Sequence, residues 1–392
     1  MGTLAVTYDG TTKNITMSNA PVIAYGGKTL VSAGSWEGDK TLKCGGKWMI
    51  SDVTIGNRTL KTKYTWGKSD IQINYTKASA STPSIVTEST TITVPEGYNM
   101  VQFFACGGGG GTDSYPSFEK GSAGAGGGGG YTNEIALSTT PGTTYILNIG
   151  PGGKKTDGTA STIYQDTTLI LTAEGGKAAT GNRYYSDYDS SKDSYTGYAG
   201  SGGSGGGNWT SVAKGGASGG TDGGDGAGAS SGTSYSRGKG QGTTTKCSFM
   251  TNSPAYGAGG GGTYSSARSP IATVSDDSTS SDISINVYLE QARKKALAST
   301  EYALLAGGAT GGGHGGCWYR GGKAFDTSSD GDTLHDFKGA VLAATSGTAG
   351  TGGGGGGGFY YYYDPANGYS GAQSSSGGNG GSGVIIYRFY EV

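Results

Sequence analysis

The sequence is short of the residues that normally build a hydrophobic core or a catalytic centre. Leu, Ile, Val and Phe make up only about one residue in seven, and there are 9 prolines, 4 cysteines and 2 histidines among 392 residues. So few aliphatic residues would suggest disorder, but the large net charge of disordered chains is absent at −1. Twenty-seven tyrosines also argue against a solvated linker. The low proline content excludes collagen, as does the lack of glycine at every third position.

Other absences narrow the class of protein. The 28 basic residues meet 29 acidic ones, so the chain lacks the basic excess typical of a nucleic-acid partner. No apolar run approaches the ~20 residues of a membrane span, so we expect no membrane insertion. The first residues lack the basic and apolar regions of a signal peptide, which predicts folding in the cytoplasm where the chain is made. The cysteines lie far apart, with no CxxC pair, which favours free thiols.

Glycine is the residue in excess, and its distribution divides the chain. Eleven of the 82 glycines lie in residues 1–106, and the remainder follow the abrupt start of a glycine run at position 107. Before that point, short alternating or β-branched runs at 4–8, 52–55 and 71–75 predict a small sandwich or meander. A small, polar and proline-marked stretch at 78–84 predicts a linker. We therefore expect an N-terminal β domain at 1–85 and a glycine-rich domain at 86–392.

In the second part, short apolar strands run directly into glycine. The pattern occurs at 100–106, 169–173, 302–306 and, less clearly, 340–344, and it is reversed at the end of the chain, where glycine leads into 384–390. Residues 145–149 alternate between two turn signals and predict a further strand. Residues 288–305 contain good helix formers and could instead form a charged loop or an edge hairpin.

The glycine runs could be flexible linkers or ordered polyglycine-II helices. A polyglycine-II helix has three residues per turn and no internal hydrogen bonds, so it needs neighbours. Because ordering the backbone costs ~1–2 kcal/mol per residue and a hydrogen bond returns ~0.5–1.5 kcal/mol, only a close-packed bundle stays ordered. Strands and aromatic residues at its ends would clamp such a bundle. The sequence thus predicts a mainly β fold with packed polyglycine-II helices bracketed by strands. The glycine pairs between 215 and 224 recur every four residues and fit a loop better.

Aromatic clusters punctuate the glycine runs where loops should leave the bundle. Exposed Tyr and Trp beside small residues are typical of recognition loops, although the same rings could cap the bundle half-buried. The first cluster extends through Tyr195 and Tyr198. The candidate receptor-binding residues are Tyr184, Tyr185, Tyr188, Trp318, Tyr319, Tyr360, Tyr361, Tyr362 and Tyr363.

Several of these motifs resemble those of glycine-rich bacteriophage tail-fibre and adhesin proteins. The residues that carry the resemblance are 94–98 (VPEGY) with 104–111, 145–153 (YILNIGPGG), 383–388 (GVIIYR) and, in the first part, 41–55, which resembles an element of phage structural proteins. The resemblance implies a polyglycine-II sandwich in a virion, acting in host recognition or virion structure. It departs from shorter forms in the insertion at 265–300 and the long loop at 184–198.

Catalytic chemistry finds little support. His314 and Cys317 could supply two metal ligands without a second pair, and four aspartates between 326 and 336 are more typical of a solvated loop. Lys28 and Lys68 lie in incomplete P-loop endings that lack the leading glycine. We therefore expect no enzyme, no cofactor and no metal.

The expected partners are a host cell-surface glycan or protein and other virion fibre or baseplate proteins, in a possible homotrimer. The alternative is a purely structural virion component, such as a head fibre, decoration protein or baseplate spacer.

Overall fold

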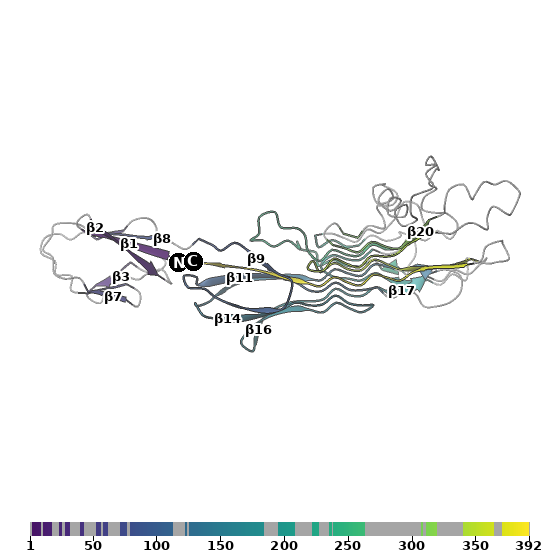
Figure 1. The fold of residues 1–392 in the computed structure, drawn as a ribbon, viewed down its shortest axis with the longest axis horizontal. Helices are drawn as coiled ribbons and strands as arrows, with labels where there is room; N and C mark the ends of the chain where they lie inside the picture. Colours follow the sequence, from purple (N-terminus) through teal and green to yellow (C-terminus); the bar gives the residue numbers. More distant parts are fainter. Residues whose placement is uncertain are drawn as a thin grey trace, which may run out of the picture.

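A computed structural model gives the fold (Figure 1). The residues that it describes are 2–8, 11–17, 23–25, 28–31, 40–42, 52–55, 58–61, 71–76, 79–112, 122–123, 125–183, 195–207, 222–226, 235–236, 238–262, 307–308, 311–319, 340–363 and 371–391. In Figure 1 the N-terminal sheets, a β-sandwich, the glycine runs and a set of short strands follow one another along the longest axis. In the part of the chain that is described, all regular elements are strands, which confirms the mainly β prediction.

The N-terminal residues form two four-stranded antiparallel sheets. The strands are β1 (Gly2–Tyr8), β2 (Thr11–Met17), β3 (Ile23–Tyr25), β4 (Lys28–Val31), β5 (Lys40–Leu42), β6 (Asp52–Ile55), β7 (Arg58–Lys61) and β8 (Ile71–Thr76). One sheet has the order β2-β1-β8-β5 and the other β4-β3-β6-β7. The three runs expected from the sequence as strands are β1, β6 and β8.

A β-sandwich follows and is built from two further antiparallel sheets. The first has the order β13-β11-β24-β9, and the second β10-β14-β15-β16. Their strands are β9 (Ser84–Val86), β10 (Thr90–Thr93), β11 (Met100–Cys106), β13 (Thr132–Ser138), β14 (Thr144–Asn148), β15 (Ser161–Gln165), β16 (Thr168–Ala173) and β24 (Val384–Tyr390). Strand β24 pairs along its whole length with β11. The last strand of the chain therefore lies beside the strand that leads into the first glycine run.

The inner faces of the two sheets form the main hydrophobic core. Phe103 and Tyr145 are fully buried there, with ring centroids 5.1 Å apart in an edge-on arrangement. Leu147 and Ile163 are fully buried beside them. The sandwich thus uses the alternation of inward and outward residues expected of paired strands.

The outer face of the first sheet has a second, smaller core. Phe104 and Ile386 lie on it and are covered by residues 243–256, which contribute Cys247 and Phe249. Arg388 lies over the ring of Phe249, 5.1 Å from its centroid, and donates to Gln102 Oε1. Residues 243–256 therefore act as a cover over this face of the sandwich.

Beyond the sandwich, the glycine runs form a bundle in which hydrogen bonds follow a three-residue period. The N–H groups of 107 and 110 donate to 131 and 128, those of 108 and 111 to 159 and 156, and those of 109 and 112 to 381 and 378. The carbonyl groups of 108 and 111 accept from 176 and 179, and those of 109 and 110 from 153 and 355. One extended segment is thus bonded to six neighbouring segments, which is the packing expected of three-residue helices without internal hydrogen bonds.

The same period recurs in two other segments of the bundle. The N–H groups of 126 and 129 donate to 207 and 204, those of 127 and 130 to 355 and 352, and those of 128 and 131 to 177 and 174. In segment 352–357, the carbonyl groups of 354 and 357 accept from 313 and 316, and those of 353 and 356 accept from 381 and 378. The predicted packing of polyglycine-II segments is therefore confirmed for the described runs.

The close approach of these backbones requires glycine. A Cβ atom at Gly109 would lie 2.0 Å from Gly353 O, and one at Gly354 would lie 2.1 Å from Gly127 O. Both distances are far inside van der Waals contact, and the clashing atoms belong to backbone that is itself hydrogen-bonded. Glycine is therefore used here for its lack of a side chain rather than for flexibility.

Side chains enter the bundle where a hydroxyl can replace a backbone partner. Ser161 is fully buried, and its Oγ donates to Cys106 O at 2.7 Å and accepts from Gly150 N at 2.9 Å. Ser204 is likewise fully buried, and its Oγ accepts from Gly223 N. These hydroxyls satisfy buried backbone groups that would otherwise lack partners.

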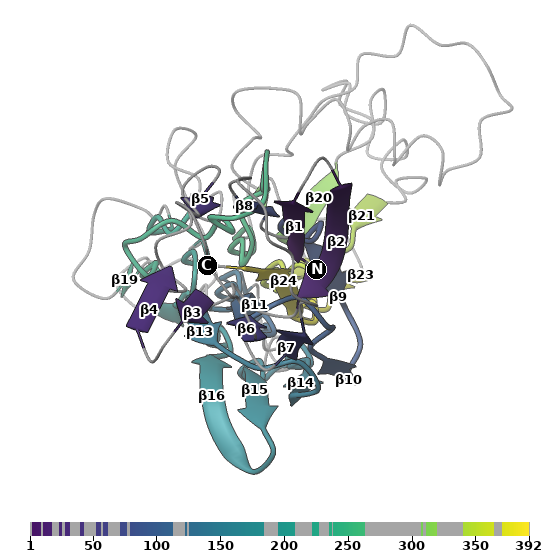
Figure 2. The same cartoon turned by 90° about the vertical axis from the view of Figure 1, so that its left-hand side faces the viewer.

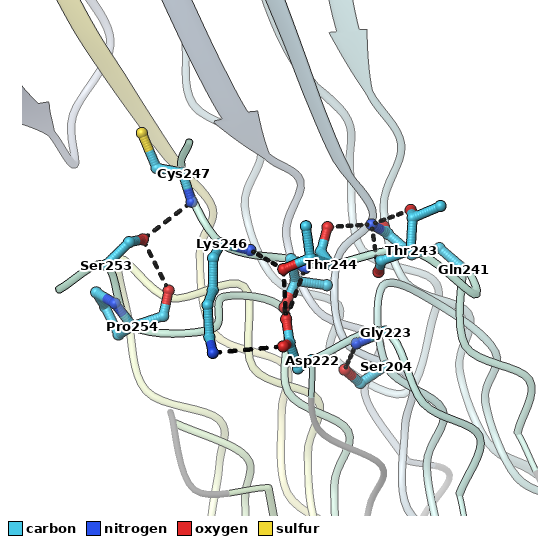
Figure 3. Close-up of polar contacts among 11 residues, drawn as sticks. Ser204, Asp222, Gly223, Gln241, Thr243, Thr244, Lys246, Cys247, Ser253 and Pro254 are labelled. Carbon is cyan, nitrogen blue, oxygen red and sulfur yellow. Dashed lines mark hydrogen bonds and ion pairs between the residues drawn. The ribbon is translucent and has the colours of Figure 1, made fainter. Parts of the chain in front are cut away.

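A polar cluster anchors the cover residues to the bundle (Figure 3). Asp222 Oδ1 accepts from Thr244 Oγ1 at 2.8 Å and from Thr245 N at 2.9 Å, and Lys246 Nζ lies 3.4 Å from Asp222 Oδ2. The hydrogen bond from the Thr245 backbone is the main cause that lowers the pKa of Asp222 below its ordinary value. The glycines at 223 and 224, expected to be loop, belong to a described segment in which Gly224 O accepts from Gly205 N.

Two predictions on organisation stay untested, and others lie outside the described residues. The division at residue 85 stays a prediction; β9 (Ser84–Val86) pairs with β24 at that point, and Ser81 N in the expected linker donates to Phe389 O. The proposed helix at 288–305 and the strand at 302–306 lie outside the described residues.

Candidate functional site at the distal end of the bundle

Three small sheets lie at the end of the bundle that is distant from the sandwich, and we call this region the distal end (Figure 1). Two glycine segments lead directly into β20 (Cys317–Tyr319) and β22 (Phe359–Tyr363), and residues 174–179 lead into β17 (Thr180–Arg183). The other strands there are β12 (Ser122–Ala123), β18 (Tyr195–Tyr198), β19 (Tyr235–Ser236), β21 (Ala340–Leu342) and β23 (Gly371–Ser375). Seen from the N-terminal end, β20, β21 and β23 lie on one side of the molecule and β19 on the other (Figure 2).

The three sheets adjoin one another. Their strand orders are β20-β21, β12-β22-β23 and β17-β18-β19. Strand β21 lies against β23, and β12 lies against β17. The distal end is therefore a continuous series of strands rather than three isolated hairpins.

Specific side chains at the top of the bundle fix the bases of these sheets. Thr112 is almost fully buried, and its Oγ1 donates to Gly356 O at 3.0 Å, three residues before β22 begins. The same hydroxyl lies 3.3 Å from Gly378 O, three residues after β23 ends. Thr112 thus joins the two segments that carry the β22–β23 hairpin.

The base of the β20–β21 hairpin is held in a similar way. His314 N donates to Thr345 Oγ1 at 2.7 Å, and Thr345 N donates to His314 O at 2.9 Å. The His314 ring is also engaged, because its Nδ1 accepts from Gly307 N at 3.1 Å. His314 therefore has a structural contact where the sequence raised the alternative of a metal ligand.

A surface carboxylate fixes the residues before β17. Asp157 Oδ1 accepts from Ala178 N at 2.8 Å, and Asp157 Oδ2 accepts from Lys177 Nζ at 2.9 Å. Burial acts to raise the pKa of Asp157, but these two hydrogen bonds and the lysine charge outweigh it and lower the pKa below its ordinary value. Since both side chains are at least half exposed, the ion pair positions the strand more than it stabilises the fold.

The predicted site residues fall into two groups. Strand β22 contains Tyr360–Tyr363, and β20 contains Trp318 and Tyr319, so the structure brings these six to the distal end. Tyr184, Tyr185 and Tyr188 lie outside the described residues; β17 ends at Arg183, one residue before them.

The register shows what lies opposite the tyrosines of β22. Tyr360 pairs with Ser374, Tyr361 with Gln373, Tyr362 with Ala372 and Tyr363 with Gly371. On the other side of β22, Ser122 pairs with Tyr360. The aromatic strand therefore lies between two strands of small and polar residues, an arrangement that the sequence order alone does not reveal.

Three further tyrosines of the distal end, Tyr195, Tyr198 and Tyr235, were not among the predicted site residues. Tyr198 ends β18 and has 52% of its surface exposed. The sequence places Tyr198 in an aromatic cluster but gives no sign that it pairs with Thr180 at the base of β17. Tyr235, in β19, pairs with Gly197 and stands in a run of glycine and serine without any strand signal.

The search for other kinds of site gives negative results for the described part of the chain. There, no group of three or more His, Cys, Asp or Glu residues could hold a metal ion. In the same residues, no helix has the length and apolar character needed to cross a bilayer. Cys106 and Cys247 are buried free thiols; burial raises the pKa of Cys247 to about 11 and raises that of Cys106 further, so neither is a ready nucleophile.

Comparison with known proteins places the chain in a family. No curated protein matches it. The family model described as "Glycine-rich domain" matches residues 84–390, which is more than half of the chain and covers the sandwich, the bundle and the distal end. The chain therefore belongs to the glycine-rich domain family.

Proposed function

We propose that the protein is a tail-fibre or adhesin-type structural protein of a bacteriophage virion that binds a host cell-surface receptor through its distal end. The observation that carries the proposal is the gathering of β20, β22 and β18, which bear Trp and Tyr, at one end of a bundle built largely from glycine segments. Aromatic residues beside small ones supply rigid contact area at low entropic cost.

The rest of the molecule suits such a role. The bundle is built from backbone hydrogen bonds in three directions, so it can hold the distal strands at a fixed place relative to the sandwich. The N-terminal sheets lie at the opposite end of the molecule, which is the natural position for attachment to other virion fibre or baseplate proteins (Figure 1). Under this proposal the protein functions on the virion and does not catalyse a reaction.

The test is adsorption of the purified full chain to cells of the strain that the virion infects, together with competition against infection. We expect saturable adsorption and a reduced infection rate. Absence of adsorption, with infection unaffected, would contradict the receptor-binding role. Release of reducing sugar from host polysaccharide would instead indicate a depolymerase.

A second candidate function, a purely structural virion component, is favoured by the bundle itself. The six neighbours of segment 107–112 come from the same chain, so this segment needs no second copy for its hydrogen bonds. This candidate predicts many copies along the particle in electron micrographs of antibody-labelled virions, and no competition with infection. The solution mass would separate a single chain from a homotrimer.

A further inference from the structure

From β20 to β18, every third strand in the series of distal strands carries aromatic residues. In spatial order they are β20, β21, β23, β22, β12, β17, β18 and β19. The aromatic-bearing strands are β20 (CWY), β22 (FYYYY), β18 (YTGY) and, directly beside β18, β19 (YS). The strands between them carry AVL, GAQSS, SA and TGNR.

This order sets aromatic strands at regular intervals. Two small-residue strands separate β20 from β22, and two separate β22 from β18. Hydrogen-bonded strands of one sheet lie about 4.8 Å apart, so successive aromatic strands, which also have one step between sheets between them, are on the order of 15 Å or more apart. A surface of this kind presents the same chemistry three times over.

The chemistry of the intervening strands indicates the kind of ligand. Three of them, β12, β17 and β23, contain hydroxyl- or amide-bearing residues, namely Ser122, Asn182, Gln373, Ser374 and Ser375, whereas β21 is apolar. A ligand that repeats a ring with an apolar face and a hydroxyl-bearing edge would match this alternation, since apolar faces stack on aromatic rings and hydroxyls bond to polar side chains. A stacked polyanion such as nucleic acid would require a basic excess, which the net charge of −1 does not provide.

We propose that the distal end binds a linear polysaccharide whose sugar rings stack on β20, β22 and β18 in turn, with polar residues of β12, β17 and β23 hydrogen-bonding to its hydroxyl groups. The inference rests on the proposed receptor-binding function and names the receptor class. The alternative is a protein receptor, and the first experiment below distinguishes the two.

The first experiment measures adsorption of the full chain to three preparations of host cells: untreated, protease-treated and periodate-oxidised. The proposal expects binding to the first two and loss on the third, because periodate cleaves sugar rings. Binding that survives periodate and is lost after protease would overturn the polysaccharide while leaving the receptor-binding function intact. No binding to untreated cells would overturn the proposed function itself.

The second experiment separates ring stacking from other effects of substitution. Tyr361 and Tyr363 occupy alternate positions of β22, and Tyr360 and Tyr362 the other two, so the pairs belong to opposite faces. We expect alanine at one of the two pairs to weaken binding to the extracted host polysaccharide at least about tenfold, and phenylalanine at that pair to restore it. Unchanged binding for both alanine pairs would overturn the proposal.

Two controls test whether the substitutions act only at the distal end. Tyr164→Ala changes a half-buried tyrosine of the sandwich, distant from the distal strands, and should leave binding unchanged. Slow amide exchange at residues 107–111 in each variant shows that the bundle is intact.

Binding should also rise with the length of the oligosaccharide, because a chain that reaches a second aromatic strand gains a linked contact. Equal affinity at all lengths would contradict the repeated site.

Discussion

The sandwich and the bundle both have an ordered interior, but side chains fill the first and backbone fills the second. In the sandwich, Phe103, Tyr145, Leu147 and Ile163 fill the space between two sheets, and the backbone pairs only within each sheet. In the bundle, side chains are almost absent, and the backbone of segment 107–112 bonds to six neighbours in all directions around it. The first gains its stability from buried apolar surface, and the second from the density of hydrogen bonds.

The difference teaches how each region tolerates change. A side-chain core can repack around a substitution, because rotamers adjust. A bundle of touching backbones has little such freedom, since most of the atoms in contact belong to the main chain. The predictions below test that contrast, beginning with the largest effect.

The bundle should fail at the smallest possible addition. Gly109→Ala would place a methyl group 2.0 Å from Gly353 O, which only a shift of both segments can relieve. We expect a loss of more than about 4 kcal/mol, or failure to fold, measured by thermal unfolding and soluble yield. Gly142→Ala is the matched control, because its Cβ meets nothing within 4 Å and only the positive φ of 86° opposes it. It should cost about 1 kcal/mol. Equal effects of the two variants would contradict the packing of the bundle.

A cavity in the core of the sandwich should lower the stability of the protein. Phe103→Ala removes a fully buried ring that lies against Tyr145 and should cost about 3–5 kcal/mol in denaturant unfolding. Phe103→Leu, which refills most of the volume, should recover most of that loss. If the sandwich behaved like the bundle, the leucine variant would be as damaging as the alanine variant.

The junction between the two regions should be sensitive to one hydroxyl. Ser161→Ala leaves Cys106 O and Gly150 N without their partner in a fully buried position, and we expect a loss of about 1–3 kcal/mol. Faster amide exchange at Gly150 than in the unaltered chain would locate the effect. A neutral result would show that the two regions are not coupled through this residue.

The cover residues should respond most weakly, and in a pH-dependent way. The pKa of Asp222 is lowered in the folded chain, so its contribution to stability is present above its ordinary value of 3.8 and is lost as the pH falls through the folded pKa. Asp222→Asn should therefore lower stability by at most about 1 kcal/mol at pH 7 and remove this acid-dependent loss. The readout is the melting temperature of both chains from pH 7 to pH 3. Parallel curves would contradict the role of Asp222.

The strands and glycine segments of both regions could be predicted from the sequence, but which segments lie next to one another could not. Apolar runs ending in glycine identified β11, β16 and β24, because a strand that faces a core carries its signal in its own residues. Which glycine segments bond to which could not be predicted, since a residue without a side chain carries no information about its neighbour. The six neighbours of segment 107–112 follow from the path of the whole chain.

The candidate site was predicted in the same partial way. Clustering of Tyr and Trp identified β20 and β22 as aromatic segments, but the small-residue strands that separate them come from distant parts of the sequence. Tyr235 gave no signal because a two-residue strand has no periodicity to detect. The cover over Phe104 was missed because Cys247 and Phe249 are single apolar residues in a polar run.

The path of the chain through the bundle also governs when the molecule can be completed during its synthesis. Two of the hydrogen bonds donated by segment 107–112 end on residues 378 and 381, and strand β11 awaits β24. A ribosome must therefore translate nearly three hundred further codons before the earliest glycine run acquires its last neighbour. Shortened products that stop before this point would expose bare, unpaired main chain, so the cell has to shelter the growing polypeptide or lose it to aggregation.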